Sequence, residues 1–150
     1  MIVDGKVRLL EFNTRIGDPE GETILLRLES DFAEVLYAAA TDSLSGISMK
    51  WNNLSVVTVV LASRGYPDTP EIGKKITGID VAAALPKVQI FHMGTRFIKE
   101  NGWYTNGGRV LAVTASGDTV QEARNRAYEA VGVIKFDGMQ FRTDIGESLT

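Results

Sequence analysis

Three side chains near the start of the chain have the chemistry to bind a divalent cation and a phosphoryl group together. Glu11, Asn13 and Arg15 alternate with other residues, so an extended backbone would project all three to one side. A carboxylate and an amide carbonyl are hard oxygen ligands of the kind that Mg²⁺ accepts. A guanidinium offers a planar, charged fork to phosphoryl or acyl-phosphate oxygens. The residue types would suit a metal and nucleotide site, but a lone Glu-x-Asn on a strand is more often a solvated face.

The residues that follow this trio also suit an anion. Gly17 allows a tight turn, and Asp18-Pro19 is typical of a helix start, with Asp18 as N-cap and Pro19 in the first position. Backbone N–H groups at a helix start attract negative charge. Asp18 is therefore a candidate substrate-binding residue.

A second candidate site lies at residues 106–108, Asn-Gly-Gly, which are followed by Arg109. Backbone N–H groups in such a turn can cradle a phosphate, but Asn-Gly is also a strong hairpin signal. A single glycine pair lacks the surrounding pattern that makes phosphate loops specific. We retain Gly107, Gly108 and Arg109 as candidate substrate-binding residues. His92, the only histidine, receives no role, because a lone histidine is more often packed or hydrogen-bonded than catalytic.

Both helices and strands are needed to position these groups. Residues 6–13 have a strand pattern, and the Asp-Gly turn before them marks the second arm of a hairpin whose first arm we expect to be missing. A helix is expected after Ser30. Beyond residue 50 the pattern changes to short strands, at residues 55–62, 88–93 and 109–115, with a capped helix after Thr119. These patterns predict an α+β fold with a domain boundary near residue 50.

Composition narrows the classes of function. The chain has 150 residues, 44% of them hydrophobic, and a net charge of −3 without a dense run of Lys or Arg. We therefore expect a folded protein that does not bind nucleic acid. The longest apolar run, residues 56–62, is too short to span a bilayer. There is no cysteine and no secretory signal at the N-terminus, so a cytoplasmic setting is the default expectation.

The motif EFNTRIGDPE at residues 11–20 resembles the final motif of glycinamide ribonucleotide synthetases, also called phosphoribosylamine–glycine ligases, in the ATP-grasp superfamily. The resemblance covers nearly the whole chain, because further family segments follow in order: LLRLESDF, VVLASRGYP, VQIFHMGT, TNGGRVLAVTASGDTVQEARNRAYEAV and FRTDIG. Gly21, Glu22, Arg64 and Asp68 depart from the residues usual in the family. These departures leave the Glu and Asn of the motif intact.

The resemblance implies a fold and a site. Residues 1–50 would form the C-terminal end of an ATP-grasp domain, and residues 51–150 a small C-terminal α+β domain with a mainly antiparallel sheet. Glu11 and Asn13 would bind the Mg²⁺ or Mn²⁺ that holds ATP. The E-x-N-x-R pattern shared across ATP-grasp ligases would make Arg15 the catalytic cation that faces the transferred phosphoryl group.

The resemblance also implies a reaction: ATP-dependent ligation of glycine to 5-phosphoribosylamine in de novo purine synthesis, through glycyl phosphate. In the family the loop and lysines that grip ATP precede this segment, and here the motif follows Met1 almost at once. We therefore expect a truncated, catalytically incomplete chain. Two alternatives remain: a non-enzymatic binding or assembly module built on residues 51–150, and another ATP-grasp carboxylate–amine ligase.

Overall fold

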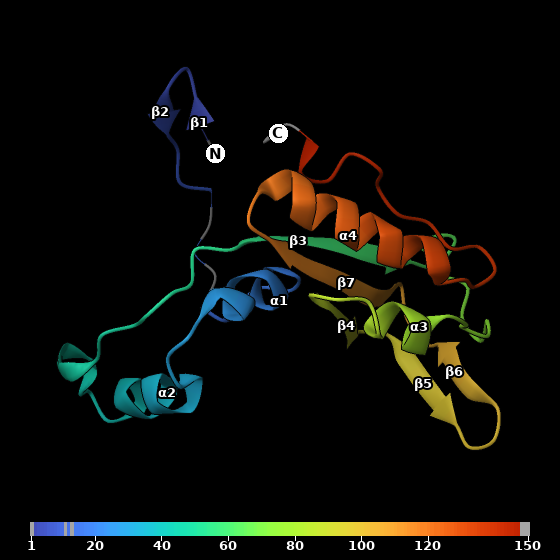
Figure 1. The fold of residues 1–150 in the computed structure, drawn as a ribbon, viewed down its shortest axis with the longest axis horizontal. Helices are drawn as coiled ribbons and strands as arrows, with labels where there is room; N and C mark the ends of the chain where they lie inside the picture. The colour runs from blue at the N-terminus through green and yellow to red at the C-terminus, as the bar shows by residue number, and fades with distance from the viewer. Residues whose placement is uncertain (1, 11, 13, 148–150) are drawn as a thin grey trace.

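A three-stranded antiparallel sheet with the strand order β3-β7-β4 organises the larger part of the chain (Figure 1). The computed structural model describes residues 2–10, 12 and 14–147. Val113 of the middle strand lies opposite Val59 on one side and Ile90 on the other. The three strands are β3 (Ser55–Ala62), β4 (Val88–His92) and β7 (Arg109–Gly117). Their positions and the α+β class agree with the sequence prediction.

Helix α4 (Val120–Val133) covers one face of this sheet. Its buried face consists mainly of alanine, which lets the helix lie close to the strands; the buried residues are Ala123, Ala127, Ala130 and Val131. The hydroxyl of Thr119 accepts a hydrogen bond from the Glu122 N–H at 3.2 Å, as the capping pattern predicts. The Glu122 carboxylate accepts from the Asp118 N–H instead of the Thr119 N–H. Leu61, Leu111 and Ile134 are fully buried between helix and sheet.

The sequence prediction missed two smaller elements. Strands β5 (Thr95–Ile98) and β6 (Gly102–Thr105) form a separate hairpin, and α3 (Ile79–Ala83) packs beside β4 and α4. The expected hairpin turn at residues 106–108 is wrong, because this segment joins β6 to β7, and those two strands lie in different sheets. Thr77 and Lys135 form an isolated antiparallel bridge.

The N-terminal hairpin is shorter than expected but complete. Strand β1 (Ile2–Val3) pairs with β2 (Lys6–Val7). Asp4 and Gly5 both have positive φ, 51° and 72°, as the central residues of a type I′ turn require. The expectation of a missing first arm was therefore wrong. The second arm ends at Val7, and residues 8–10, 12 and 14 belong to no strand.

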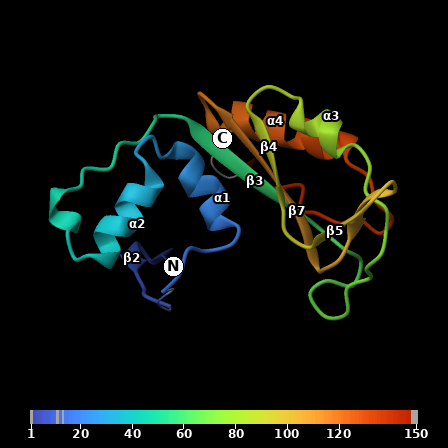
Figure 2. The same ribbon diagram turned by 90° about the horizontal axis from the view of Figure 1, so that it is seen from below.

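Helix α1 (Glu20–Ile24) lies against the sheet face opposite α4, as Figure 2 shows. Its N-cap is Pro19 and no side chain caps it, so Asp18 does not serve as the expected cap. The 3₁₀ helix η1 (Leu25–Arg27) continues it, and α2 (Phe32–Ala40) and η2 (Leu44–Gly46) follow. Asp31 caps α2, accepting from the Ala33 N–H at 2.8 Å.

After η2 the chain runs back antiparallel to the residues that follow η1, and then enters the sheet. Leu28 and Trp51 form an antiparallel bridge, and the Glu29 N–H donates to the Lys50 carbonyl at 2.9 Å. This contact brings the start of β3 back beside η1. Within the part of the chain that the structure describes, no helix has the length and apolar character needed to cross a bilayer.

Candidate functional site

The best-defined contact between the N-terminal motif and the sheet is the pair Asp18 and Arg109. Arg109 begins β7 and Asp18 lies just before α1, 91 residues earlier in the sequence. Nη1 of Arg109 donates to the Asp18 carbonyl at 2.7 Å, and Nη2 lies 3.5 Å from the Asp18 carboxylate. Both side chains are partly exposed, so the guanidinium remains accessible to a ligand.

This pair borders a hollow of about 400 Å³ with mixed polar and apolar walls, which we call the Arg109 hollow. Its walls come from four separate segments of the chain: Asp18, Tyr66, Pro67, Pro70, Met93, Gly94, Gly108 and Arg109. A Cβ on Gly108 would lie 2.4 Å from Cδ2 of Tyr66. Glycine therefore allows the tyrosine ring to approach the backbone closely at this point.

The loop that carries Tyr66 is fixed by hydrogen bonds at both ends. The Glu71 N–H donates to the Arg64 carbonyl at 2.9 Å, and the Thr69 N–H donates to the Gly65 carbonyl at 2.9 Å. The Gln140 side-chain amide donates to the Tyr66 carbonyl at 3.3 Å. These bonds hold the aromatic wall of the Arg109 hollow in place without a ligand.

The glycine pair before Arg109 is held by Ser63, a buried residue at the end of β3. The Ser63 hydroxyl donates to the Gly107 carbonyl at 2.9 Å, and the Ser63 N–H donates to the Gly108 carbonyl at 2.8 Å. The Asn106 N–H donates to the Gly94 carbonyl, so it is not free for a phosphate. The structure therefore brings Gly108 and Arg109 to the hollow with Asp18. Gly107 is not among the residues that line the hollow, and its carbonyl accepts the hydrogen bond from Ser63.

The predicted metal ligands cannot be placed in the same way. Glu11 and Asn13 lie outside the described residues, and the strand on which their alternation depended ends at Val7. Arg15 is exposed, and its Nη1 donates to the Ile16 carbonyl at 3.0 Å. Among residues 2–10, 12 and 14–147, no three His, Cys, Asp or Glu side chains gather closely enough to hold a metal ion. The donor types of Glu11 and Asn13 nevertheless fit Mg²⁺ or Mn²⁺ chemically, since both offer oxygen.

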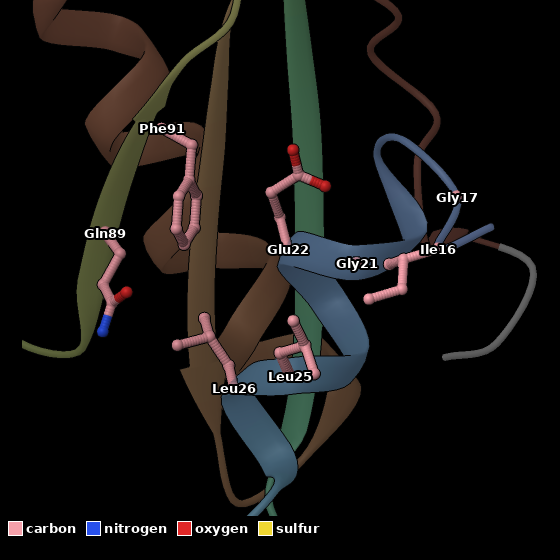
Figure 3. A pocket seen from close by; sticks show the side chains of 8 residues that line it. All are labelled: Ile16, Gly17, Gly21, Glu22, Leu25, Leu26, Gln89 and Phe91. Carbon is pink, nitrogen blue, oxygen red and sulfur yellow. The ribbon is translucent and has the colours of Figure 1, made fainter. Parts of the chain in front are cut away.

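A second hollow, of about 350 Å³, lies between α1 and the edge strand β4 (Figure 3). Its lining is mostly apolar, and the Glu22 carboxylate and Gln89 amide are the polar side chains among the residues that line it: Ile16, Gly17, Gly21, Glu22, Leu25, Leu26, Gln89 and Phe91. None of these lining residues is a lysine or an arginine. The hollow is therefore less suited to a phosphorylated substrate than the Arg109 hollow.

His92 is not part of either hollow. Its Nδ1 lies 2.8 Å from the Thr95 hydroxyl, and its ring lies 4.0 Å from that of Trp103, centroid to centroid. Partial burial lowers the pKa of His92 below its usual value of 6.5. Hydrogen bonding and ring packing thus account for this residue, in line with the sequence interpretation.

Several residues of the Arg109 hollow were missed by the chemical reading of the sequence. Tyr66, Pro67, Met93 and Gly94 line it, and they lie in the segments RGYP and HMGT, which had carried the family resemblance but no chemistry of their own. The sequence does contain a local indication of this site: in each of two short loops a proline or glycine follows an aromatic or sulfur-containing residue, as Tyr66-Pro67 and Met93-Gly94.

Comparison with known proteins gives a consistent result. Residues 56–148 match the family model "Phosphoribosylglycinamide synthetase, C domain". The chain is 48% identical over 143 residues to a chloroplastic phosphoribosylamine–glycine ligase of Arabidopsis thaliana, covering 95% of the chain and 27% of that protein. It is 48% identical to the phosphoribosylamine–glycine ligase of Streptomyces coelicolor, covering 93% of the chain and 34% of that protein.

A solved structure agrees with these sequence matches. The crystal structure of a phosphoribosylamine–glycine ligase from Thermotoga maritima superposes with a TM-score of 0.72 and 38% identity, over 96% of this chain and 34% of that one. The chain spans only 27% and 34% of the length of the two curated relatives described above.

Proposed function

The chain belongs to the phosphoribosylglycinamide synthetase family, and we propose that it is part of an ATP-dependent ligase that joins glycine to 5-phosphoribosylamine in purine synthesis. In this reaction the glycine carboxylate attacks the γ-phosphorus of ATP, which gives glycyl phosphate and ADP. The amine of phosphoribosylamine then attacks the acyl carbon and displaces phosphate, which forms the amide. The names and identities of the relatives support the proposal.

The Arg109 hollow is the structural observation that carries the proposal. It joins the N-terminal motif to the Gly-Gly-Arg segment through the 2.7 Å bond between Arg109 and the Asp18 carbonyl. A guanidinium suits a phosphate or carboxylate, because its planar fork binds two oxygens. We assign Asp18, Gly108 and Arg109 to substrate binding in this hollow, with Gly107 as support.

The reaction needs no nucleophile from the protein, so catalysis consists of positioning and charge neutralisation. Glu11 and Asn13 would hold Mg²⁺ or Mn²⁺ through their side-chain oxygens. A divalent ion there supplies charge neutralisation of the ATP phosphates. Arg15 would bind the oxygens of the transferred phosphoryl group, and its planar fork suits the developing acyl phosphate better than a lysine would.

We further propose that residues 1–50 end an ATP-grasp domain and that residues 51–150 form the C-terminal domain. Because the chain spans about a third of its relatives' length, the complete reaction is proposed for a longer protein. By itself, the 150-residue chain should show no ATP- and glycine-dependent ligation, since the family's ATP-gripping lysines and loop are not among its residues.

The test is steady-state kinetics on the complete ligase at varied Mg²⁺ and ATP, measuring ADP formation that depends on glycine and phosphoribosylamine. Glu11→Gln should lower turnover by about 10²-fold or more, because it removes a charge that balances the metal. Asn13→Asp, which keeps an oxygen ligand, is the matched control for Asn13→Ala and should be milder. Arg15→Lys should lower kcat more than it weakens ATP binding. Wild-type turnover by Glu11→Gln at low Mg²⁺ would contradict the assignment.

A further inference from the structure

Three threonine hydroxyls form a hydrogen-bonded chain that runs from helix α1 to the central strand of the sheet. The Oγ1 atoms of Thr23 and Thr58 are 2.7 Å apart, and those of Thr58 and Thr114 are 2.9 Å apart. Thr23 belongs to α1, Thr58 to β3 and Thr114 to β7. Thr114 is fully buried, whereas the other two are half-buried. Helix α1, which carries Thr23, lies on the sheet face that α4 does not cover (Figure 2).

The outer end of this chain lies at the start of α1, where the Thr23 hydroxyl is 3.4 Å from the Pro19 carbonyl. Each threonine hydroxyl can both donate and accept, so the two threonine pairs can be oriented in either direction. In both orientations Thr58 is the link between Thr23 and the fully buried Thr114.

Strand β7 thus holds the start of α1 at two points. Arg109 binds the Asp18 carbonyl directly, and Thr114 reaches the Pro19 carbonyl through Thr58 and Thr23. Thr114 lies five positions after Arg109, about 16 Å along a strand. The segment that follows the N-terminal motif is thus held by β7 directly at Asp18 and, through Thr58, at Thr23 within α1.

We propose that Thr58 is a positioning residue that holds this segment for the ligase reaction through its hydroxyl group. The role in the reaction rests on the proposed function, whereas the anchoring itself does not. The Thr58 hydroxyl bonds to Thr23 and Thr114, and neither of these is a candidate substrate-binding residue. It acts by keeping α1, and with it the adjoining motif, in one place relative to Arg109, and small misplacements of reacting groups are costly in rate.

The first test is amide hydrogen exchange on the 150-residue chain. Thr58→Val keeps the side-chain shape, removes two hydrogen bonds and leaves the buried Thr114 hydroxyl without its partner Thr58. The amides of Gly21, Leu25 and Leu28, which donate to the Gly17, Gly21 and Leu25 carbonyls, should exchange about tenfold faster. Thr58→Ser should restore the wild-type rates.

Thr105→Val is the matched control. Thr105 is buried and its hydroxyl accepts from the Lys74 N–H at 3.0 Å, so the same chemical change is made away from α1. It should leave exchange in α1 unchanged. If Thr58→Val does not fold, Thr23→Val breaks the same chain from the helix side and leaves the sheet intact. Unchanged α1 exchange in whichever of the two folds would overturn the anchoring.

The second test uses the complete ligase. Thr58→Val should lower kcat by about tenfold while the KM values for ATP and glycine change less than twofold, and Thr58→Ser should recover the rate. Faster α1 exchange with unaltered kcat would overturn the positioning role. Absence of glycine-dependent ligation in the wild-type ligase would overturn the proposed function instead, and the exchange experiment would still decide the anchoring.

Discussion

The contact between Arg109 and Asp18 combines two interactions of unequal strength, and substitutions can separate them. The ion pair has a 3.5 Å separation and side chains that are 37% and 46% exposed. Pairs of this kind contribute about 0–1 kcal/mol. The bond from Nη1 to the Asp18 carbonyl is 2.7 Å long. A hydrogen bond from a charged donor contributes about 1.5–3 kcal/mol when shielded from water, and partial exposure reduces this to about 1 kcal/mol.

Asp18→Asn removes the charge but keeps the carbonyl, so it should cost less than about 0.5 kcal/mol. Arg109→Met removes every donor but retains the apolar stem, so it should cost about 1–1.5 kcal/mol. The free energy of unfolding in urea measures both costs. Exchange at the Gly21 N–H, which donates to the Gly17 carbonyl at 2.9 Å, reports the loss locally.

Salt provides an independent check, because screening weakens an exposed ion pair more than a short hydrogen bond. Raising the ionic strength should remove the small effect of Asp18→Asn and leave most of the effect of Arg109→Met. If Asp18→Asn costs as much as Arg109→Met at low salt, the carboxylate carries the contact and this reasoning is refuted.

Three further predictions concern other parts of the chain. Gly108→Ala places a Cβ 2.4 Å from the Tyr66 ring and should cost about 1–3 kcal/mol in urea unfolding, whereas Gly132→Ala, in open space on α4, should stabilise by up to about 1 kcal/mol. Leu111→Ala, at a fully buried site on β7, should cost about 2–5 kcal/mol, and a loss below 1 kcal/mol would contradict the core assignment. Because burial lowers the pKa of His92 below 6.5, the unfolded chain binds the proton more readily; thermal stability should fall as the pH drops through 6.5, and His92→Gln should remove this slope.

The parts of the fold that the sequence predicted are those with strong local patterns. Residues 56–62 form an unbroken run of β-branched and apolar residues, and β3 spans Ser55–Ala62. Thr119 and Glu122 predicted the start of α4 because capping is a local interaction. Helix α3 and the hairpin β5-β6 were missed, since both are short and depend on contacts with distant segments for their stability.

In the candidate site, too, local sequence patterns identified residues but not their contacts with distant segments. Arg109 was selected from its neighbours in the sequence, but nothing local indicates that it would bind the backbone of Asp18, 91 residues away. The strand was expected to continue past Val7, and for residues 8–10 and 12 this was wrong, because the alternation of side chains was taken as evidence for pairing. Residues 8–10, 12 and 14 belong to no strand, and an unpaired strand is not stable in water. The placement of the two predicted metal ligands, Glu11 and Asn13, stays a prediction.

The strand order β3-β7-β4 also constrains when this domain can fold during synthesis. The middle strand is the last of the three to leave the ribosome, because β7 begins at Arg109. Until then β3 and β4 have no partner in their sheet, and α4, which follows β7, cannot yet cover their apolar faces. The nascent chain therefore carries the segment SVVTVVLA of β3 unpaired through the synthesis of about fifty further residues, and such segments are prone to associate with one another. The late arrival of β7 makes this interval the one in which a chaperone would be of most use to the chain.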